Sequence, residues 1–326
     1  MKQLVKGLLV TSLLVTGVMA KEEIKTTEVK AVSTATVTQD IQIFTSDNSD
    51  GKITPASIED AFKKAGFFIS ANRDMNGPFK KQFKETTFDV YNLFTFYSKE
   101  KTLELAKKYP NIGLFSPMSM SIYTKKGEKK ISISSLTVDA MAKILKIPAD
   151  DVILVKVGNM VKEALKSAMP QGKFETLSYS VQSLTGEQVS SYKMEMDPEE
   201  WEDEKESLQM EFEGTLAPNG FVMAGFNDLN FDFKKSKYEA YDFYDVYSIC
   251  KLPVIYTVAK VHPEAGAYAP CSLYMYKKKG EKNMHLAFPS VYNWISSMDI
   301  KDKESLTVLK EAQASMHKIL TELLEE

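Results

Sequence analysis

The feature that most constrains this chain is an internal repeat. The segment Tyr109–Tyr123 aligns without a gap to His262–Tyr276, and the turn sequence KKGEK follows each of them at the same distance. Upstream, FDVYNLFTFY (Phe88–Tyr97) matches YDFYDVYSIC (Tyr241–Cys250) at the same spacing of 153 residues. Prolines, glycines and the turn coincide at one offset, which is typical of a repeated structural unit. We therefore predict a tandem duplication.

The first predicted repeat spans residues 41–170, and strand and helix signals are mixed along it. Thr54 is a helix N-cap followed by Pro55 in the first helical position, and Gly66 ends that helix. A longer amphipathic helix is predicted over Val152–Ala168. Strands are expected in the segments 41–43, 67–71, 88–97, 114–124 and 130–136. This mixture predicts an α+β two-layer unit.

The second predicted repeat spans residues 171–326 and includes an insert at its start. Residues 174–183 and 188–196 are predicted to form a hairpin that turns at Thr185-Gly186. A very acidic helix then begins at Asp197-Pro198, where the helix macrodipole favours acidic side chains. That helix is either a solvated surface or a cation-binding surface, and it lacks the residue spacing of a calcium loop.

Composition and the N-terminus indicate the compartment. The 326 residues are 44% hydrophobic and 26% charged, with a net charge of −3. These values exclude a disordered or multi-span membrane chain, and the missing basic excess argues against nucleic acid as a partner. Lys2 and Lys6 precede an apolar run that is too short to span a bilayer, and Ala20 precedes a plausible cleavage site. We predict a signal peptide over residues 1–20, a flexible tether over 21–40, and an exported, periplasmic protein without a membrane-spanning segment.

The motifs resemble those of the domain-of-unknown-function 302 family. In the first repeat Ile112–Pro117 (IGLFSP) and Ile122-Tyr123 match one of that family's patterns, and in the second repeat Gly266, Pro270-Cys271 and Tyr276 match it. The resemblance implies a β-α-β(4)-α unit in each repeat, similar to one half of the TATA-binding protein, with an antiparallel sheet backed by helices. Because members of the family resemble homodimers of single domains, it also implies a monomer that holds a pseudo-two-fold dimer within one polypeptide.

The two cysteines of the chain both lie in the second repeat. The family pattern places one cysteine in each of two motifs, and these are Cys250 and Cys271 here, whereas the first repeat has Tyr97 and Met118 at the matching positions. Joint presence and joint absence are expected of residues that act as a pair. In an exported protein the pair is a disulfide, a reactive or redox-active thiol pair, or a site for a soft metal such as copper. Two plain buried thiols are the remaining alternative.

Few other side chains offer chemistry. Met275 and His285 are the secondary candidates to complete a soft-metal site with the cysteines. Asp74 and Asp228 occupy the family's aspartate position in each repeat, where they either cap a turn or contribute to a polar site. Aromatic side chains are numerous on the predicted strands, and they either pack the repeats together or line a pocket for a small apolar ligand; they are Tyr91, Phe94, Tyr244, Tyr247, Tyr268, Tyr274 and Tyr276.

The sequence lacks the common enzyme signatures: it has no nucleophile elbow, phosphate-binding loop, dinucleotide fingerprint or zinc-protease motif. We therefore expect a periplasmic, non-enzymatic binding or accessory protein whose specific chemistry lies at Cys250 and Cys271. Its partner would be a small ligand or an envelope protein. One alternative is a thiol–disulfide or sulfur-related redox protein, which requires an accessible thiol with a depressed pKa. The other is a purely structural envelope protein.

Overall fold

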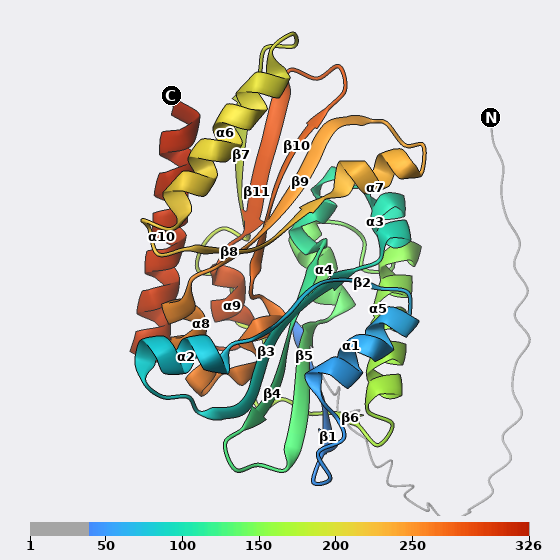
Figure 1. Ribbon diagram of the computed structural model, residues 1–326, viewed down its shortest axis with the longest axis vertical. Helices are drawn as coiled ribbons and strands as arrows, with labels where there is room; N and C mark the ends of the chain where they lie inside the picture. Colours follow the sequence, from blue (N-terminus) through green and yellow to red (C-terminus); the bar gives the residue numbers. More distant parts are fainter. Residues whose placement is uncertain (1–38, 326) are drawn as a thin grey trace, which may run out of the picture. The chain divides into compact units, whose positions relative to one another are not determined.

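The computed structural model describes residues 39–325 (Figure 1). The predicted signal peptide lies outside the described residues, as does the predicted tether apart from Gln39 and Asp40. The first half of the described chain (residues 39–174) contains β1 (Ile41–Asp47), α1 (Pro55–Lys64), β2 (Phe68–Asp74), α2 (Asn76–Phe83), β3 (Phe88–Tyr97), α3 (Lys99–Ala106), η1 (Pro110–Phe115), β4 (Met118–Lys125), β5 (Lys130–Leu136), α4 (Val138–Leu145), α5 (Val152–Ala168) and β6 (Lys173–Phe174). The second half (residues 175–325) contains β7 (Val189–Glu195), α6 (Trp201–Leu216), β8 (Val222–Asp228), α7 (Leu229–Lys235), β9 (Tyr241–Cys250), α8 (Leu252–Val261), η2 (Pro263–Ala267), β10 (Cys271–Lys278), β11 (Asn283–Pro289), α9 (Tyr292–Ser297) and α10 (Lys303–Glu325).

The strands form two antiparallel sheets with the same strand order. The first sheet runs β2-β3-β4-β5-β1-β6, and the second runs β8-β9-β10-β11-β7. Each pairing between neighbouring strands in the described chain is antiparallel. The predicted α+β class, with antiparallel sheets backed by helices, is confirmed.

The hairpin predicted at the start of the second repeat does not form. The short strand β6 pairs with β1, where the ring of Phe174 lies 4.8 Å from that of Phe44, and β7 pairs with β11 in the other sheet. Of the first predicted arm only Phe174 lies in a strand, in the first sheet, whereas the second arm forms β7 of the second sheet. The predicted acidic helix is present as α6, but it begins at Trp201 rather than at Asp197-Pro198, and Glu202, Asp203 and Glu204 lie in its first turn.

Helices cover one face of each sheet. Figure 1 shows α1 and α5 along the first sheet and α6 and α10 along the second. Under α1, the ring of Phe62 packs against Phe94 and Phe96 of β3 at 5.2 and 4.7 Å. Under α6, Gln209 donates a hydrogen bond to the hydroxyl of Tyr247 on β9. The helices begin where capping residues allow: Thr54 and Ser57 form a capping box at α1, and Asp151 caps α5.

The other faces of the sheets bring the two halves together through reciprocal contacts. Tyr91 donates a hydrogen bond to the carbonyl of Pro263 at 3.1 Å, and the corresponding Tyr244 donates one to Pro110 at 2.5 Å. Tyr274 and Tyr276 are also buried, and both contact the ring of Tyr244, Tyr274 edge-on and Tyr276 at a tilt. Tyr268 lies beyond the sheet, stacked on Trp294. The inward-facing tyrosines therefore pack the halves together, which is one of the two roles that the sequence left open for the aromatic residues.

Two glycines allow the halves to approach this closely. A Cβ atom on Gly266 of η2 would lie 2.4 Å from the Cβ of Ser121, and 2.8 Å from that residue's backbone nitrogen and Cα. At the corresponding Gly113 of η1 it would lie 2.6 Å from the Cβ of Tyr274. Real Cβ atoms do not pack at such distances, so each position requires a residue without a side chain.

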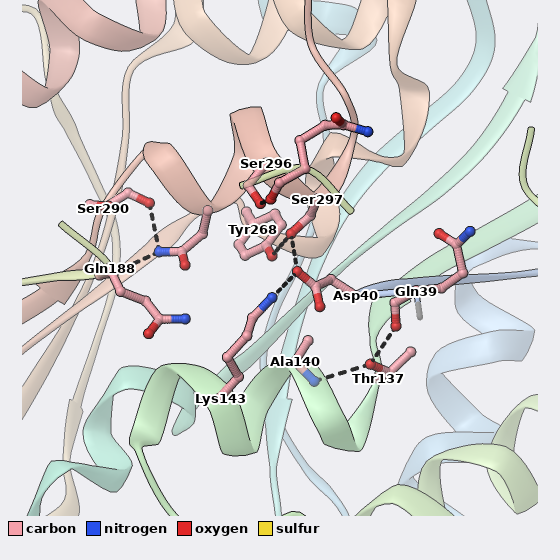
Figure 2. A network of polar contacts seen from close by, with 12 residues as sticks. Gln39, Asp40, Thr137, Ala140, Lys143, Gln188, Tyr268, Ser290, Ser296 and Ser297 are labelled. Atoms are coloured by element: carbon pink, nitrogen blue, oxygen red, sulfur yellow. Dashed lines mark hydrogen bonds and ion pairs between the residues drawn. The ribbon is translucent and has the colours of Figure 1, made fainter. Parts of the chain in front are cut away.

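A polar network also joins the halves at the start of the described chain (Figure 2). The buried carboxylate of Asp40 pairs with Lys143 of α4 and accepts a hydrogen bond of 2.7 Å from Ser297 of α9. The hydroxyls of Ser297 and Tyr268 are 2.7 Å apart. Gln39 accepts a hydrogen bond from Thr137 through its backbone carbonyl. Gln39 and Asp40, the two residues before β1, are therefore held in place by residues of both halves.

Candidate functional site

The edge strands of the two sheets lie side by side and create two junctions. β2 ends the first sheet and β8 ends the second, and Ser70 of β2 donates a hydrogen bond of 2.9 Å to the amide oxygen of Asn227 on β8. At one end of this contact lies Cys250 of β9, which is paired with Val222 of β8. At the other end lies Tyr97 of β3, which is paired with Phe68 of β2. These two places are the corresponding positions of the two halves.

The junction that holds Cys250 contains a cavity of about 430 Å³, which we call the junction cavity. Its wall is mainly apolar and comes from both halves, with Met75 and Leu93 from the first half and Val222, Met223 and Leu252 from the second. Arg73 and Asp74 of β2 are the charged residues of the lining. Two residues singled out from the sequence, Cys250 and Asp74, are thus brought to one cavity although they are far apart in the chain.

The corresponding junction around Tyr97 is filled, and we call it the closed junction. The side chain of Tyr97 is 3% exposed, and its hydroxyl donates a hydrogen bond of 2.9 Å to Asp232 of α7. Lys99 forms an ion pair of 2.7 Å with the same carboxylate and lies over the ring of Phe68 at 4.4 Å. At the junction cavity Cys250 stands in the position of Tyr97, Leu252 in that of Lys99, and Pro78 in that of Asp232. The junction with the small cysteine side chain is therefore the one that contains a cavity.

The family assignment follows from comparison with known proteins. Residues 43–168, from β1 to the end of α5, match the family described as "Domain of unknown function DUF302". These residues belong to the DUF302 family. One solved structure, described as "Crystal structure of uncharacterized conserved protein DUF302 from Bacillus stearothermophilus", is 15% identical over 42% of this chain and 95% of that chain, with a TM-score of 0.32. None of the curated proteins compared with the chain is detectably similar to it.

The two aspartates at the family's aspartate position each stabilise the start of a helix. Asp74, within the DUF302 domain, accepts hydrogen bonds from the backbone N–H groups of Asn76 and Gly77 at 3.1 and 3.3 Å. Asp228 accepts one from the N–H of Phe231 at 2.8 Å, as the N-cap of α7. Both therefore act in the local turn, which is the first of the two roles expected of them. Asp74 in addition borders the junction cavity.

Of the alternatives that the sequence left open for the two cysteines, the disulfide is not formed in the structure, where both thiols are free. Cys271 of β10 is in register with Ile249 of β9. Cys250 is the next residue along β9 and ends that strand, so it is not the register partner of Cys271. Cys250 borders the junction cavity, and both cysteines border a smaller cleft of about 60 Å³ under α8 and α10, whose wall includes Trp294 and Phe288.

The environment of the cysteines suppresses their ionisation. Burial raises the pKa of Cys250 to about 12, and the proximity of Cys271 adds to this effect. Burial likewise raises the pKa of Cys271 to about 12. Both residues are therefore neutral thiols at physiological pH, which is the opposite of the depressed pKa that a reactive or redox-active cysteine requires.

The other predicted metal ligands do not join the cysteines. Met275 is 1% exposed and lies in the hydrophobic core, in register with Leu286. His285 stacks on Tyr276 at 4.9 Å, with its Nε2 3.7 Å from Glu281, and Tyr276 is five residues along β10 from Cys271. Burial lowers the pKa of His285. Within residues 39–325, no group of three or more histidine, cysteine, aspartate or glutamate residues is arranged to hold a metal ion.

Two features of this site escaped the sequence argument. Arg73 is the only arginine in the chain, a count that could have drawn attention to it. The difference between Tyr97 and Cys250 was visible in the sequence, but it pointed to a cysteine pair rather than to a difference in side-chain volume at a junction.

None of the helices in the described part of the chain is long and apolar enough to cross a membrane.

Proposed function

We propose that this protein is an exported, non-enzymatic binding protein and that it holds a small, mainly apolar molecule in the junction cavity. The observation that carries the proposal is the cavity itself, which lies where the corresponding junction is filled by Tyr97. Its volume of about 430 Å³ is within the range of small-ligand sites, and its apolar lining with a few polar groups is typical of them. Cys250 is then a residue of the cavity wall whose small size leaves room for the ligand.

We also infer that the two halves arose by duplication and form a pseudo-two-fold pair. The shared strand order, the reciprocal hydrogen bonds of Tyr91 and Tyr244, and the paired glycines Gly113 and Gly266 support this inference. A duplicated pair starts with two equivalent junctions. One has been kept open and the other filled, so the chain has a single site supported by two halves.

The redox alternative has less support. A thiol that exchanges disulfides needs a stabilised thiolate. The raised pKa values of Cys250 and Cys271 disfavour such a role.

The proposal is tested by replacing Cys250 with tyrosine, the residue that fills the closed junction. The variant is Cys250→Tyr, alone and together with Pro78→Asp, which reproduces the pair formed by Tyr97 and Asp232. The probe is N-phenyl-1-naphthylamine, a neutral apolar dye that fluoresces when bound. We expect the wild type to bind the dye with one site and the variants to lose that binding while unfolding cooperatively.

The matched control is Cys271→Met, which places the residue of the first half in the smaller cleft. It should bind the dye as the wild type does, because Cys271 does not border the junction cavity. Unchanged dye binding by folded Cys250→Tyr, or no binding by the wild type, would refute the proposed site. Export is tested separately, by fractionating cells and locating the cleavage after Ala20 by mass spectrometry.

A further inference from the structure

We propose that the ligand of the junction cavity carries a carboxylate on an apolar body and that Arg73 binds this carboxylate. This inference rests on the proposed function, because it specifies the chemical class of the molecule bound there. It goes beyond volume and apolarity, since it concerns the one group in the cavity wall that is suited to hold an anion.

The first observation is the identity of the residue. The chain has 41 basic residues, and Arg73 is the only one that is not lysine. Arginine presents a planar, permanently charged fork that binds a carboxylate through two parallel hydrogen bonds, which lysine cannot do. The single position with this geometry lines the largest apolar-walled cavity described at the contact between the halves.

The second observation is that the guanidinium has no partner within the described chain. No hydrogen bond or ion pair formed by its side chain occurs among residues 39–325. The adjacent Asp74 directs its two carboxylate oxygens to the backbone N–H groups of Asn76 and Gly77. Arg73 is exposed to solvent at the edge of the cavity, so its cation is available to a ligand that enters there.

The closed junction supplies the contrast. The residue that corresponds to Arg73 is Asn227, as their register partners Leu93 and Val246 show. Asn227 is 8% exposed and accepts a hydrogen bond from Ser70. Lys99 of that junction is paired with Asp232. The closed junction thus satisfies its cation internally, whereas the open junction keeps an unpaired one beside an apolar cavity.

Charge balance favours a carboxylate over a phosphate. The guanidinium of Arg73 can neutralise one negative charge. The carboxylate of Asp74, in the same lining, is already held by the backbone N–H groups of Asn76 and Gly77. The rest of the cavity wall is mostly apolar. A phosphate monoester carries more than one negative charge at neutral pH and needs further donors. A monoanionic acid with an apolar chain or ring fits both the single charge and the apolar wall.

The experiment compares three competitors that share an eight-carbon chain: octanoate, octanol and octyl phosphate. Each displaces N-phenyl-1-naphthylamine from the wild type, Arg73→Gln and Arg73→Lys. We expect octanoate to displace the dye from the wild type at a concentration at least about tenfold lower than octanol, as for one charge-assisted pair. Arg73→Gln should abolish that preference, and Arg73→Lys should retain only part of it. The affinity for the neutral dye is measured first in each of the three proteins, so that displacement is compared at equal occupancy by the dye.

The outcomes separate this inference from the proposed function. Equal displacement by octanoate and octanol, or a preference that survives in Arg73→Gln, overturns the role of Arg73 while dye binding keeps the cavity as the site. A stronger effect of octyl phosphate overturns the choice of a carboxylate in favour of a phosphate. If the wild type does not bind the neutral dye, the proposed function fails and the inference fails with it.

Discussion

The two junctions between β2 and β8 are built from corresponding residues and differ in outcome. In the closed junction Tyr97, Lys99 and Asp232 form a compact polar cluster under the ring of Phe68. In the open one Cys250, Leu252 and Pro78 leave a cavity of about 430 Å³ with the unpaired Arg73 at its wall. The comparison teaches that two halves with corresponding strands can keep the same packing while a few side chains decide which junction contains a cavity.

The largest expected effect is on the stability of the protein, and it concerns the glycines that allow the two halves to approach closely. Gly266→Ala would place a methyl group 2.4 Å from the Cβ of Ser121 and 2.8 Å from its backbone, which cannot move aside as a side chain can. We expect the free energy of unfolding to fall by about 3 kcal/mol, measured by urea denaturation. Gly113→Ala, which meets mainly the side chains of Tyr274 and Tyr244, should cost less.

The control for these variants is Gly214→Ala in α6. No atom lies within 4 Å of a Cβ at that position, and alanine favours the helix by about 1 kcal/mol. A loss of stability in Gly214→Ala as large as in Gly266→Ala would mean that the glycines of η1 and η2 do not set the distance between the halves.

The element-level fold could be predicted from the sequence because its signals are local. The helix Val152–Ala168 has the predicted bounds, and Thr54 caps α1 as expected. The predicted hairpin failed because the partner of a strand is a long-range property: β7 pairs with β11, about a hundred residues further along the chain.

The site was only partly predictable for the same reason. Cys250 and Asp74 were named from the sequence, but their common cavity exists only because β2 and β8, from different halves, lie side by side. The sequence left a disulfide open because it does not give the strand register, which sets Cys271 beside Ile249 instead of Cys250. Arg73 carries no local signal other than being the sole arginine.

A second variant should turn the closed junction into an open one. Tyr97→Cys removes the buried ring and leaves Asp232 with Lys99 as its partner. We expect a loss of about 2 kcal/mol in the free energy of unfolding, because a large buried side chain is replaced by a small one. The folded variant should also bind N-phenyl-1-naphthylamine at two sites, as counted by isothermal titration calorimetry. A stoichiometry that stays at one site would show that the tyrosine alone does not close the junction.

The smallest expected effect concerns the rate at which the two cysteines react with an alkylating reagent. Because burial raises the pKa of Cys250 and Cys271 to about 12, only a very small fraction of either is thiolate at pH 7.5. The higher basicity of each thiolate recovers part of the lost rate, so alkylation by iodoacetamide should be at least about tenfold slower than for a free cysteine. Between pH 7 and pH 10 the rate should keep rising with pH, whereas that of an ordinary cysteine levels off near pH 9. Mass spectrometry of peptides resolves the two sites, and octanoate should protect Cys250 while leaving Cys271 unchanged. Rapid alkylation of the native protein at neutral pH would instead favour the redox interpretation, in which the two cysteines are reactive, over the interpretation of Cys250 as a residue of the cavity wall.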